Sequence, residues 1–302
     1  MILFVFEGRK REPNLFRAIE SLFFKDRQHI VCSFDNNIYE LYKKLRDFDD
    51  AGDISSVLRE KYLGSENSPF PENARSSDFS EIYLIFDYDF HNKNITVADM
   101  NRQILEMLEL FDNETENGKL YINYPMVEAI RYTKKLPDAE FHTYTVSRQR
   151  CAEMSFKKLS DEFSDYKSLD FLTLNEHRSA TESEIRTRAK NWMLLQEQNV
   201  IKANYLCTGR LSMPENKDDI SQKEIFDAQL QDYVLPKDCV SILSAFPMFL
   251  YEYFPAPAGL SLEEVHESRI AALKSAIEEG LDNGIAEDFD SDSHLKSMKG
   301  TR

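Results

Sequence analysis

The chain has 302 residues, of which 42% are hydrophobic and 30% are charged. This balance is typical of a globular protein and excludes a disordered chain, a collagen and a small disulfide-stabilised scaffold. With 37 basic and 53 acidic residues, the formal net charge is −16, which excludes a surface that attracts nucleic acid over its whole area. A nucleic-acid ligand would therefore be held locally, through metal ions or with a basic partner.

The first half of the chain alternates short apolar runs with amphipathic segments. The apolar runs predict strands at 2–6, 29–34, 82–86 and 120–123. The amphipathic segments predict helices at 13–23, 38–48 and 97–111, and a further helix that begins at Pro125. The stretch 49–79 is polar and contains two prolines, so we predict a loop or an insertion there. This alternation predicts an α/β fold with a mostly parallel sheet flanked by helices.

After about Cys151 the pattern changes. Helices are predicted at 148–163, 182–198 and 220–233, and the apolar segment 239–254 is expected to pack onto the first half. We therefore expect a catalytic domain at 1–147, a mainly helical region at 148–255, and a linker with an amphipathic helical tail and acidic arm at 256–302.

Cysteine spacing and apolar run lengths bear on the cellular location. The four cysteines are far apart in sequence and form no C-x-x-C pair, which favours free thiols in a reducing compartment. The apolar run at 2–6 is too short for a secretion signal, and no run approaches the ~20 residues of a membrane span. We expect a cytoplasmic protein without membrane contact.

Three carboxylates follow two of the predicted strands. Glu7 follows the first strand, and Asp87 and Asp89 follow the strand at 82–86. Ligands of parallel sheets bind at the carboxyl ends of the strands, and residues two apart point to the same side. Neighbouring carboxylates repel each other unless a cation lies between them, and Mg²⁺ or Mn²⁺ suits such oxygen ligands. The pattern predicts a metal site that activates water against a phosphodiester; the alternative is a solvated turn.

These residues resemble a known family. An apolar strand ending in Glu7-Gly8 and a later one ending in Asp87-Tyr88-Asp89 are similar to the two signatures of the TOPRIM domain of topoisomerases, primases and OLD-family nucleases. The segment FEGRKREPNLFRAI, residues 6–19, looks like the RloB and AbiLii branch of phage-defence proteins, although Arg11 and Leu15 replace its usual threonine and tyrosine. The turn 123–128 resembles the N-P-x-x-E-like turn of that branch.

The resemblance covers about residues 1–140 and implies a Mg²⁺-dependent nuclease of anti-phage defence. Its substrate would be DNA or RNA, including tRNA, and an ATPase partner would gate its activity. It implies that Glu7 is a catalytic residue and metal ligand and that Asp87 and Asp89 are the metal-binding pair. It also implies that Glu12 holds a second metal, and the alternative for Glu12 is a carboxylate in the first turn of a helix, where the helix dipole favours it. Glu128 is a weaker candidate, for which a helix-surface role is the alternative.

Other polar residues beside these carboxylates have less specific patterns. Arg9, Lys10 and Arg11 are placed to anchor a substrate phosphate, with solvated loop charges as the alternative. His91 is placed to orient a water or a leaving group, and an ordinary loop histidine is the alternative. Gly8 would let the backbone pass close to the metal.

The C-terminal segment carries a separate resemblance. Residues 261–264 form a capping box, and 267–299 look like the toxin-binding part of ParD-type antitoxins, without the DNA-binding half that normally precedes it. The resemblance implies that Leu273, Ile277 and Phe289 bind a ParE-like partner. A helix that packs on its own chain, or a fused tail, would give the same pattern.

Three hypotheses for the whole protein follow. The first is the metal-dependent nuclease. The second is a phosphatase of the haloacid dehalogenase type, which also uses D-x-D after a strand, but His91 stands where that family has threonine or valine. The third is a catalytically silent TOPRIM-like protein that binds a partner through its C-terminal tail.

Overall fold

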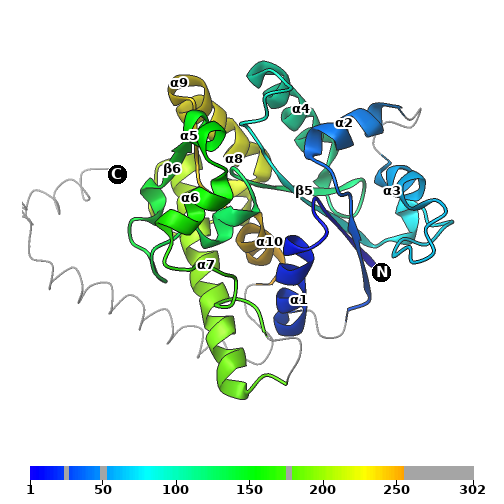
Figure 1. The fold of residues 1–302 in the computed structure, drawn as a ribbon, viewed down its shortest axis with the longest axis horizontal. Helices are drawn as coiled ribbons and strands as arrows, with labels where there is room; N and C mark the ends of the chain where they lie inside the picture. Colours follow the sequence, from blue (N-terminus) through cyan, green and yellow to red (C-terminus); the bar gives the residue numbers. More distant parts are fainter. Residues whose placement is uncertain (24–26, 48–52, 175–178, 255–302) are drawn as a thin grey trace, which may run out of the picture. The chain divides into compact units, whose positions relative to one another are not determined.

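A five-stranded sheet in the order β2-β1-β3-β5-β4 lies at the centre of the fold (Figure 1). Four strands are parallel: β1 (Ile2–Phe6), β2 (His29–Ser33), β3 (Glu81–Asp87) and β5 (Gly118–Asn123). The short β4 (Asp112–Asn113) pairs antiparallel with β5. The prediction of an α/β fold with a mostly parallel sheet is confirmed.

The computed structural model describes residues 1–23, 27–47, 53–174 and 179–254. They belong to one unit, Met1–Leu260, and a second unit comprises Ser261–Arg302. The predicted tail helix and its acidic arm therefore lie outside the described residues, as do Leu273, Ile277 and Phe289.

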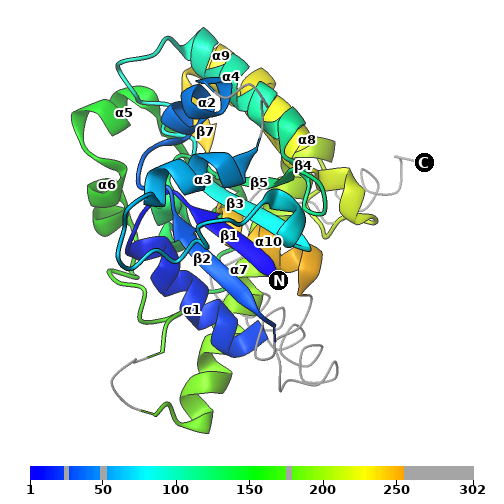
Figure 2. The same cartoon turned by 90° about the vertical axis from the view of Figure 1, so that its right-hand side faces the viewer.

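Helices cover both faces of the sheet (Figure 2). On one face lie α1 (Arg11–Phe23) and α10 (Ala245–Tyr253), because the Phe4 ring of β1 contacts Phe16 of α1 at 4.3 Å and Phe249 of α10 at 5.7 Å between centroids. The other face carries α2 (Ile38–Asp47) and α4 (Val97–Leu110), which pack together. β1 and β3 are buried almost throughout, as expected for parallel strands covered on both faces.

The prediction of a loop at 49–79 is wrong in part, because α3 (Ile54–Tyr62) lies within it. Ile54, Val57 and Leu58 are buried at helical spacing. The Asp53 side chain caps the helix by accepting from the Ser55 backbone N–H at 3.0 Å. The prolines at 69 and 71 come only after this helix has ended.

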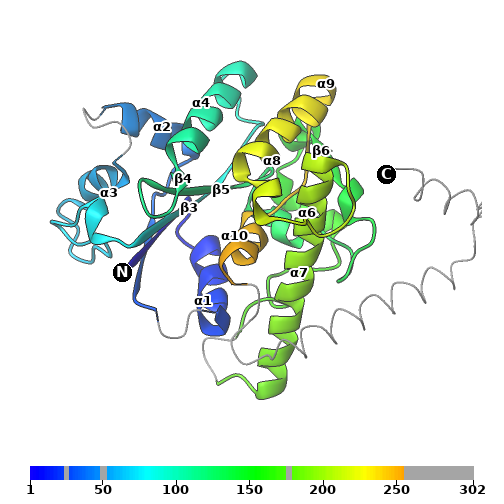
Figure 3. The same ribbon diagram turned by 180° about the vertical axis from the view of Figure 1, so that it is seen from behind.

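The second half of the described chain is mainly helical (Figure 3). Its helices are α5 (Arg148–Glu153), α6 (Phe156–Phe163), α7 (Glu182–Thr208), α8 (Gln222–Gln229) and the short α9 (Leu235–Lys237), and a π-helical turn, Leu230–Val234, joins the last two. The helix predicted at 148–163 is thus two helices, and α7 extends beyond its predicted end. Two three-residue strands, β6 (Thr145–Ser147) and β7 (Cys239–Ser241), were too short to predict and form a separate antiparallel pair.

Short 3₁₀ turns occupy several connections. They span Ser76–Asp78, Val127–Arg131, Phe141–Thr143 and Lys217–Ile220. The helix predicted to begin at Pro125 is therefore wrong in type, since a 3₁₀ turn at Val127–Arg131 takes its place. None of the helices among the described residues is long and apolar enough to cross a membrane.

The predicted return of 239–254 onto the first half is confirmed. α10 packs against β3, β5 and the long α7, and its Phe249 is fully buried. The helical region therefore shares the hydrophobic core of the sheet, and it completes the carboxyl edge of that sheet, where the predicted site residues lie.

Candidate functional site

Three carboxylates meet at the carboxyl ends of β1 and β3. Glu7 follows β1 directly, Asp87 is the last residue of β3, and Asp89 lies two residues further. The Asp87 backbone N–H donates to Glu7 Oε2 at 3.0 Å, so the two strand ends are joined through the Glu7 side chain. The structure thus brings together the three residues that the sequence singled out.

The shared burial of these carboxylates opposes their ionisation. Burial raises the pKa of Glu7 well above its ordinary value, and the charges of Asp87 and Asp89 raise it further. Burial also raises the pKa of Asp87, to which Asp89 and Glu12 add. Burial raises the pKa of Asp89, while His91 opposes that rise. At neutral pH, a proton or a cation relieves this repulsion.

Asp87 is held in place by the neighbouring strand β5. Asn123, which lies opposite Asp87 in the sheet, donates from Nδ2 to Asp87 Oδ1 at 3.0 Å. The Oδ1 atom of Asn123 accepts from the Ala245 backbone N–H at 2.8 Å, at the start of α10. Asn123 is therefore a positioning residue between the carboxylate and α10. Its place at a strand end beside β3 was the only signal of this role in the sequence.

Asp89 has a backbone conformation that suits a functional position. Its φ is 46°, in the left-handed region that aspartate tolerates better than most residues. The Asp89 backbone N–H donates to the Pro125 carbonyl at 3.1 Å, which ties the residue to the turn after β5. Its Oδ1 atom is buried and has no hydrogen-bond partner among the described residues. An unpaired buried carboxylate oxygen is costly and is a natural ligand position for a cation.

Glu12 lies in the first turn of α1, close to the other carboxylates. Burial raises its pKa, and its Oε1 accepts from the Gly8 backbone N–H at 3.3 Å. A Cβ atom on Gly8 would lie 2.9 Å from Glu12 Oε2. Gly8 therefore leaves room for the Glu12 carboxylate, and its backbone lies outside the left-handed region that only glycine favours.

Arg11 and Glu128 form an ion pair at the border of this group. Glu128 is buried in the 3₁₀ turn after β5, and its Oε2 has no hydrogen-bond partner among the described residues. Burial and the nearby Arg131 lower the pKa of Arg11, while the charge of Asp87 opposes that fall. Glu128 is therefore linked to this group by its ion pair with Arg11. It is buried and does not lie on a helix surface.

The three basic residues 9–11 do not act as one group. Arg9 pairs with Asp35, beyond the end of β2, and Arg11 pairs with Glu128. Lys10 is exposed and has no ion pair with any described residue. Arg11 also responds to the site carboxylates, because the charges of Glu12 and Asp87 oppose the lowering of its pKa.

His91, two residues after Asp89, lines a cavity of about 410 Å³. Its Nδ1 is buried and has no hydrogen-bond partner in the described parts of the chain. His91 also opposes the rise in the pKa of Asp89.

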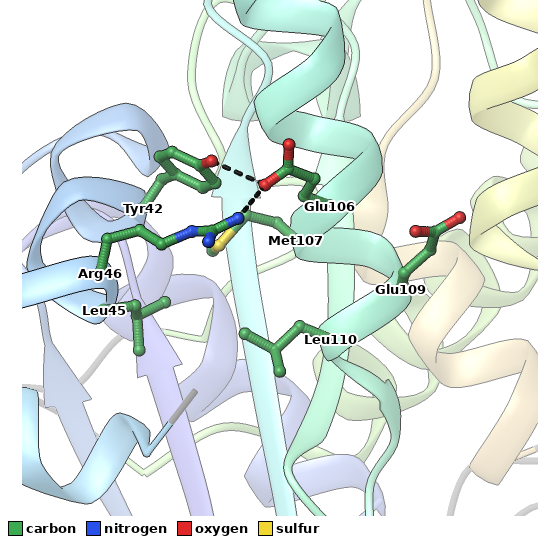
Figure 4. A pocket seen from close by; sticks show the side chains of 7 residues that line it. All are labelled: Tyr42, Leu45, Arg46, Glu106, Met107, Glu109 and Leu110. Atoms are coloured by element: carbon green, nitrogen blue, oxygen red, sulfur yellow. Dashed lines mark hydrogen bonds and ion pairs between the residues drawn. The ribbon is translucent and has the colours of Figure 1, made fainter. Parts of the chain in front are cut away.

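A second cavity of about 310 Å³ lies between α2 and α4 (Figure 4). The Glu106 carboxylate in this cavity accepts from the Tyr42 hydroxyl at 2.6 Å and pairs with Arg46. These partners lower the pKa of Glu106, so its negative charge is already compensated. The cavity lies over a face of the sheet and does not include the strand ends, so we do not place the functional site there.

The carboxylate oxygens are of the ligand type that binds a divalent cation. Glu7, Asp87 and Asp89 supply the hard oxygen ligands that Mg²⁺ and Mn²⁺ prefer, and Asp89 has an oxygen without a partner. Within the described ranges, no group of three or more His, Cys, Asp or Glu side chains is arranged as a ready metal site.

Replacing Asn123 by alanine is expected to weaken cation binding about 10- to 100-fold, because the substitution removes the amide that orients Asp87. Mn²⁺ binding followed by electron paramagnetic resonance measures this loss. Asn191→Ala is the matched control, since Asn191 donates to the Phe171 carbonyl, away from the strand ends. Unchanged Mn²⁺ affinity in a folded Asn123→Ala variant would contradict the positioning role.

No family model, no curated protein and no solved structure matches the chain.

Proposed function

We propose that the protein is a metal-dependent nuclease that hydrolyses phosphodiester bonds of DNA or RNA, including tRNA. In this proposal Glu7, Asp87 and Asp89 hold Mg²⁺ or Mn²⁺. The observation that carries it is the burial of three mutually repelling carboxylates at the ends of the adjacent parallel strands β1 and β3. Buried carboxylates destabilise a fold unless a counter-charge is present, and a divalent cation that supplies this charge can also activate water for phosphodiester hydrolysis.

In this proposal the cation and the carboxylates have different roles, which follow from their surroundings. A bound cation supplies water activation and neutralises charge on the phosphate. Asp87, fixed by Asn123, gives the cation site its orientation. Burial and the charges of Asp87 and Asp89 raise the pKa of Glu7, so in this proposal a bound cation is what keeps Glu7 ionised as a ligand.

Two neighbouring residues extend this arrangement. Arg11 lies beside Asp87 and supplies positive charge for a phosphate oxygen. Glu12, close to Glu7 and Asp87, is the position for a second cation.

The biological setting rests on the opening motif and the D-x-D motif. Their resemblance to TOPRIM proteins, and to the RloB and AbiLii branch, supports a cytoplasmic effector of anti-phage defence gated by an ATPase. The order of the elements disfavours the phosphatase alternative, because the D-x-D pair follows β3 and the first strand ends in Glu7.

A cleavage assay tests the proposal. The protein is incubated with plasmid DNA, single-stranded DNA and total tRNA, with Mg²⁺, Mn²⁺ or EDTA. We expect cation-dependent cleavage of one substrate class, which disappears in the double variant Asp87→Ala/Asp89→Ala. Asp112→Ala, which removes an exposed carboxylate on β4, is the control and should cleave as the unmodified protein does.

Two outcomes would contradict the proposal. Cleavage that survives in the folded double variant would refute the site. Cation binding without cleavage of any substrate would favour the alternative of a silent TOPRIM-like binding protein.

A further inference from the structure

The cavity next to Asp89 is built from three separate parts of the chain. One wall is the loop after β3, with His91, Asn92, Lys93 and Ile95, and it continues into the start of α4 at Thr96 and Val97. The opposite wall consists of Arg148, Gln149 and Ala152 of α5, together with Asp238. The loop after β3, the start of α4 and the helical region therefore all contribute to this cavity.

Of the three carboxylates, Asp89 has an electrostatic effect on residues at both sides of this cavity. On the loop side, His91 influences the ionisation of Asp89. On the α5 side, the Asp89 charge contributes to the raised pKa of Cys151, which is next to the lining residue Ala152. His91 is only two residues from Asp89, so their Cα atoms lie at most about 7 Å apart. A strand whose scissile phosphodiester lies at the carboxylates would therefore bring a neighbouring phosphate towards this loop.

The lining charges favour an anion. Arg148 pairs with Asp238 at 2.8 Å, which leaves Lys93 as the uncompensated charge of the cavity. Lys93 is exposed and makes no ion pair with any residue that the structure describes. In an acidic protein, an uncompensated positive charge inside a cavity is an unusual local feature.

The cavity also holds an unpaired polar atom. His91 Nδ1 is buried without a hydrogen-bond partner among the described residues. In the tautomer that carries a proton on Nδ1, it donates to an anionic oxygen placed in the cavity. The Lys93 ammonium, and the guanidinium N–H groups of Arg148 that do not face Asp238, can donate to the same anionic group.

We propose that this cavity binds the phosphate of the nucleotide next to the scissile phosphodiester. The substrate is then a nucleic-acid strand with at least two neighbouring phosphates, and a lone phosphodiester is a poor substrate. This inference rests on the proposed function, since it assigns the scissile bond to Glu7, Asp87 and Asp89.

Binding of dinucleotides tests the inference without any need for cleavage. Thymidine and uridine dinucleotides, each with or without a terminal phosphate on the 5′ or the 3′ end, are titrated into the full-length protein in EDTA by calorimetry. We expect one terminally phosphorylated form to bind about tenfold more tightly than the unphosphorylated form, because charge-assisted hydrogen bonds are added. Lys93→Gln and Arg148→Gln should each reduce this preference, and inorganic phosphate should compete with it.

Controls separate this effect from unfolding and from general charge. Lys43→Gln removes a lysine on α2 that pairs with Glu40, and it should keep the preference. Arg148→Gln also breaks the ion pair with Asp238, so Lys93→Gln is the more decisive variant, because Lys93 is exposed. Circular dichroism confirms the fold of each variant.

The outcomes distinguish this inference from the proposed function. Equal binding of all dinucleotides, with Lys93→Gln indistinguishable from the unmodified protein, would overturn the phosphate site even if nucleic acid is cleaved. A terminal-phosphate preference that Lys93→Gln abolishes would support the site even if no substrate is cleaved, and it would then be the nuclease assignment that fails.

Discussion

Asp89→Asn is expected to make the metal-free protein more stable while it lowers cleavage about 10³-fold or more. The substitution removes a buried charge that raises the pKa of both Glu7 and Asp87. Relief of such repulsion at a functional site commonly adds about 0.5–2 kcal/mol to the free energy of unfolding. Stability and activity should therefore change in opposite directions.

The pH dependence follows from the direction of the pKa shifts. Glu7, Asp87 and Asp89 have pKa values in the folded state above those of the unfolded chain. Their contribution to stability is fully present below about pH 4, where the unfolded chain is also protonated, and it is lost as the pH rises through the folded pKa values. The metal-free protein should lose stability from this source as the pH rises from about 4, and Asp89→Asn should lose less.

Urea denaturation in EDTA between pH 4 and pH 8 measures both effects, and a repeat with Mg²⁺ completes the test. Mg²⁺ should stabilise the unmodified protein by mass action and the variant much less. Asp112→Asn, at an exposed carboxylate, is the control and should match the unmodified protein in every condition. A variant that is less stable than the unmodified protein in EDTA would show that the repulsion is compensated in another way.

Phe249→Ala is expected to lower the free energy of unfolding by about 3–5 kcal/mol. The Phe249 ring is fully buried and contacts aromatic rings on three strands: Phe4 on β1, Tyr83 on β3 and Tyr121 on β5. Truncation leaves a cavity between α10 and the sheet. The sheet and the helical region therefore both lose packing contacts.

Chemical denaturation followed by fluorescence of Trp192, on α7, measures this loss in the helical region itself. Phe249→Leu, which keeps most of the volume, should cost less than about 1.5 kcal/mol. Leu211→Ala, at a side chain that is 53% exposed, should change stability by no more than about 0.5 kcal/mol. If Phe249→Ala unfolds in two separate transitions, the sheet and the helical region are not one cooperative unit.

The parts of the fold that could be predicted are those whose signal is local. β1 begins and ends where its apolar run does, and the carboxylates that follow β1 and β3 are brought together because parallel strands end at one edge. α3 was missed because the prolines at 69 and 71 made the whole stretch 49–79 look like a loop, although Ile54, Val57 and Leu58 already had helical spacing.

The parts of the site that could not be predicted depend on contacts between distant residues. Nothing near Arg11 indicates that it pairs with Glu128, and nothing near Asn123 indicates that it accepts from Ala245. These contacts arise only when the chain after β5 folds back over the strand ends, so a pattern read along the sequence does not contain them.

The link from Asp87 through Asn123 to α10 also has a consequence for the order in which the protein becomes active during synthesis. Glu7, Asp87, Asp89 and Asn123 emerge from the ribosome early, but the backbone N–H that holds Asn123 belongs to Ala245. A nascent chain that has not yet released α10 carries every carboxylate of the site with the amide of Asn123 unanchored. The proposed nuclease would thus remain incomplete until nearly all of the described chain has been made.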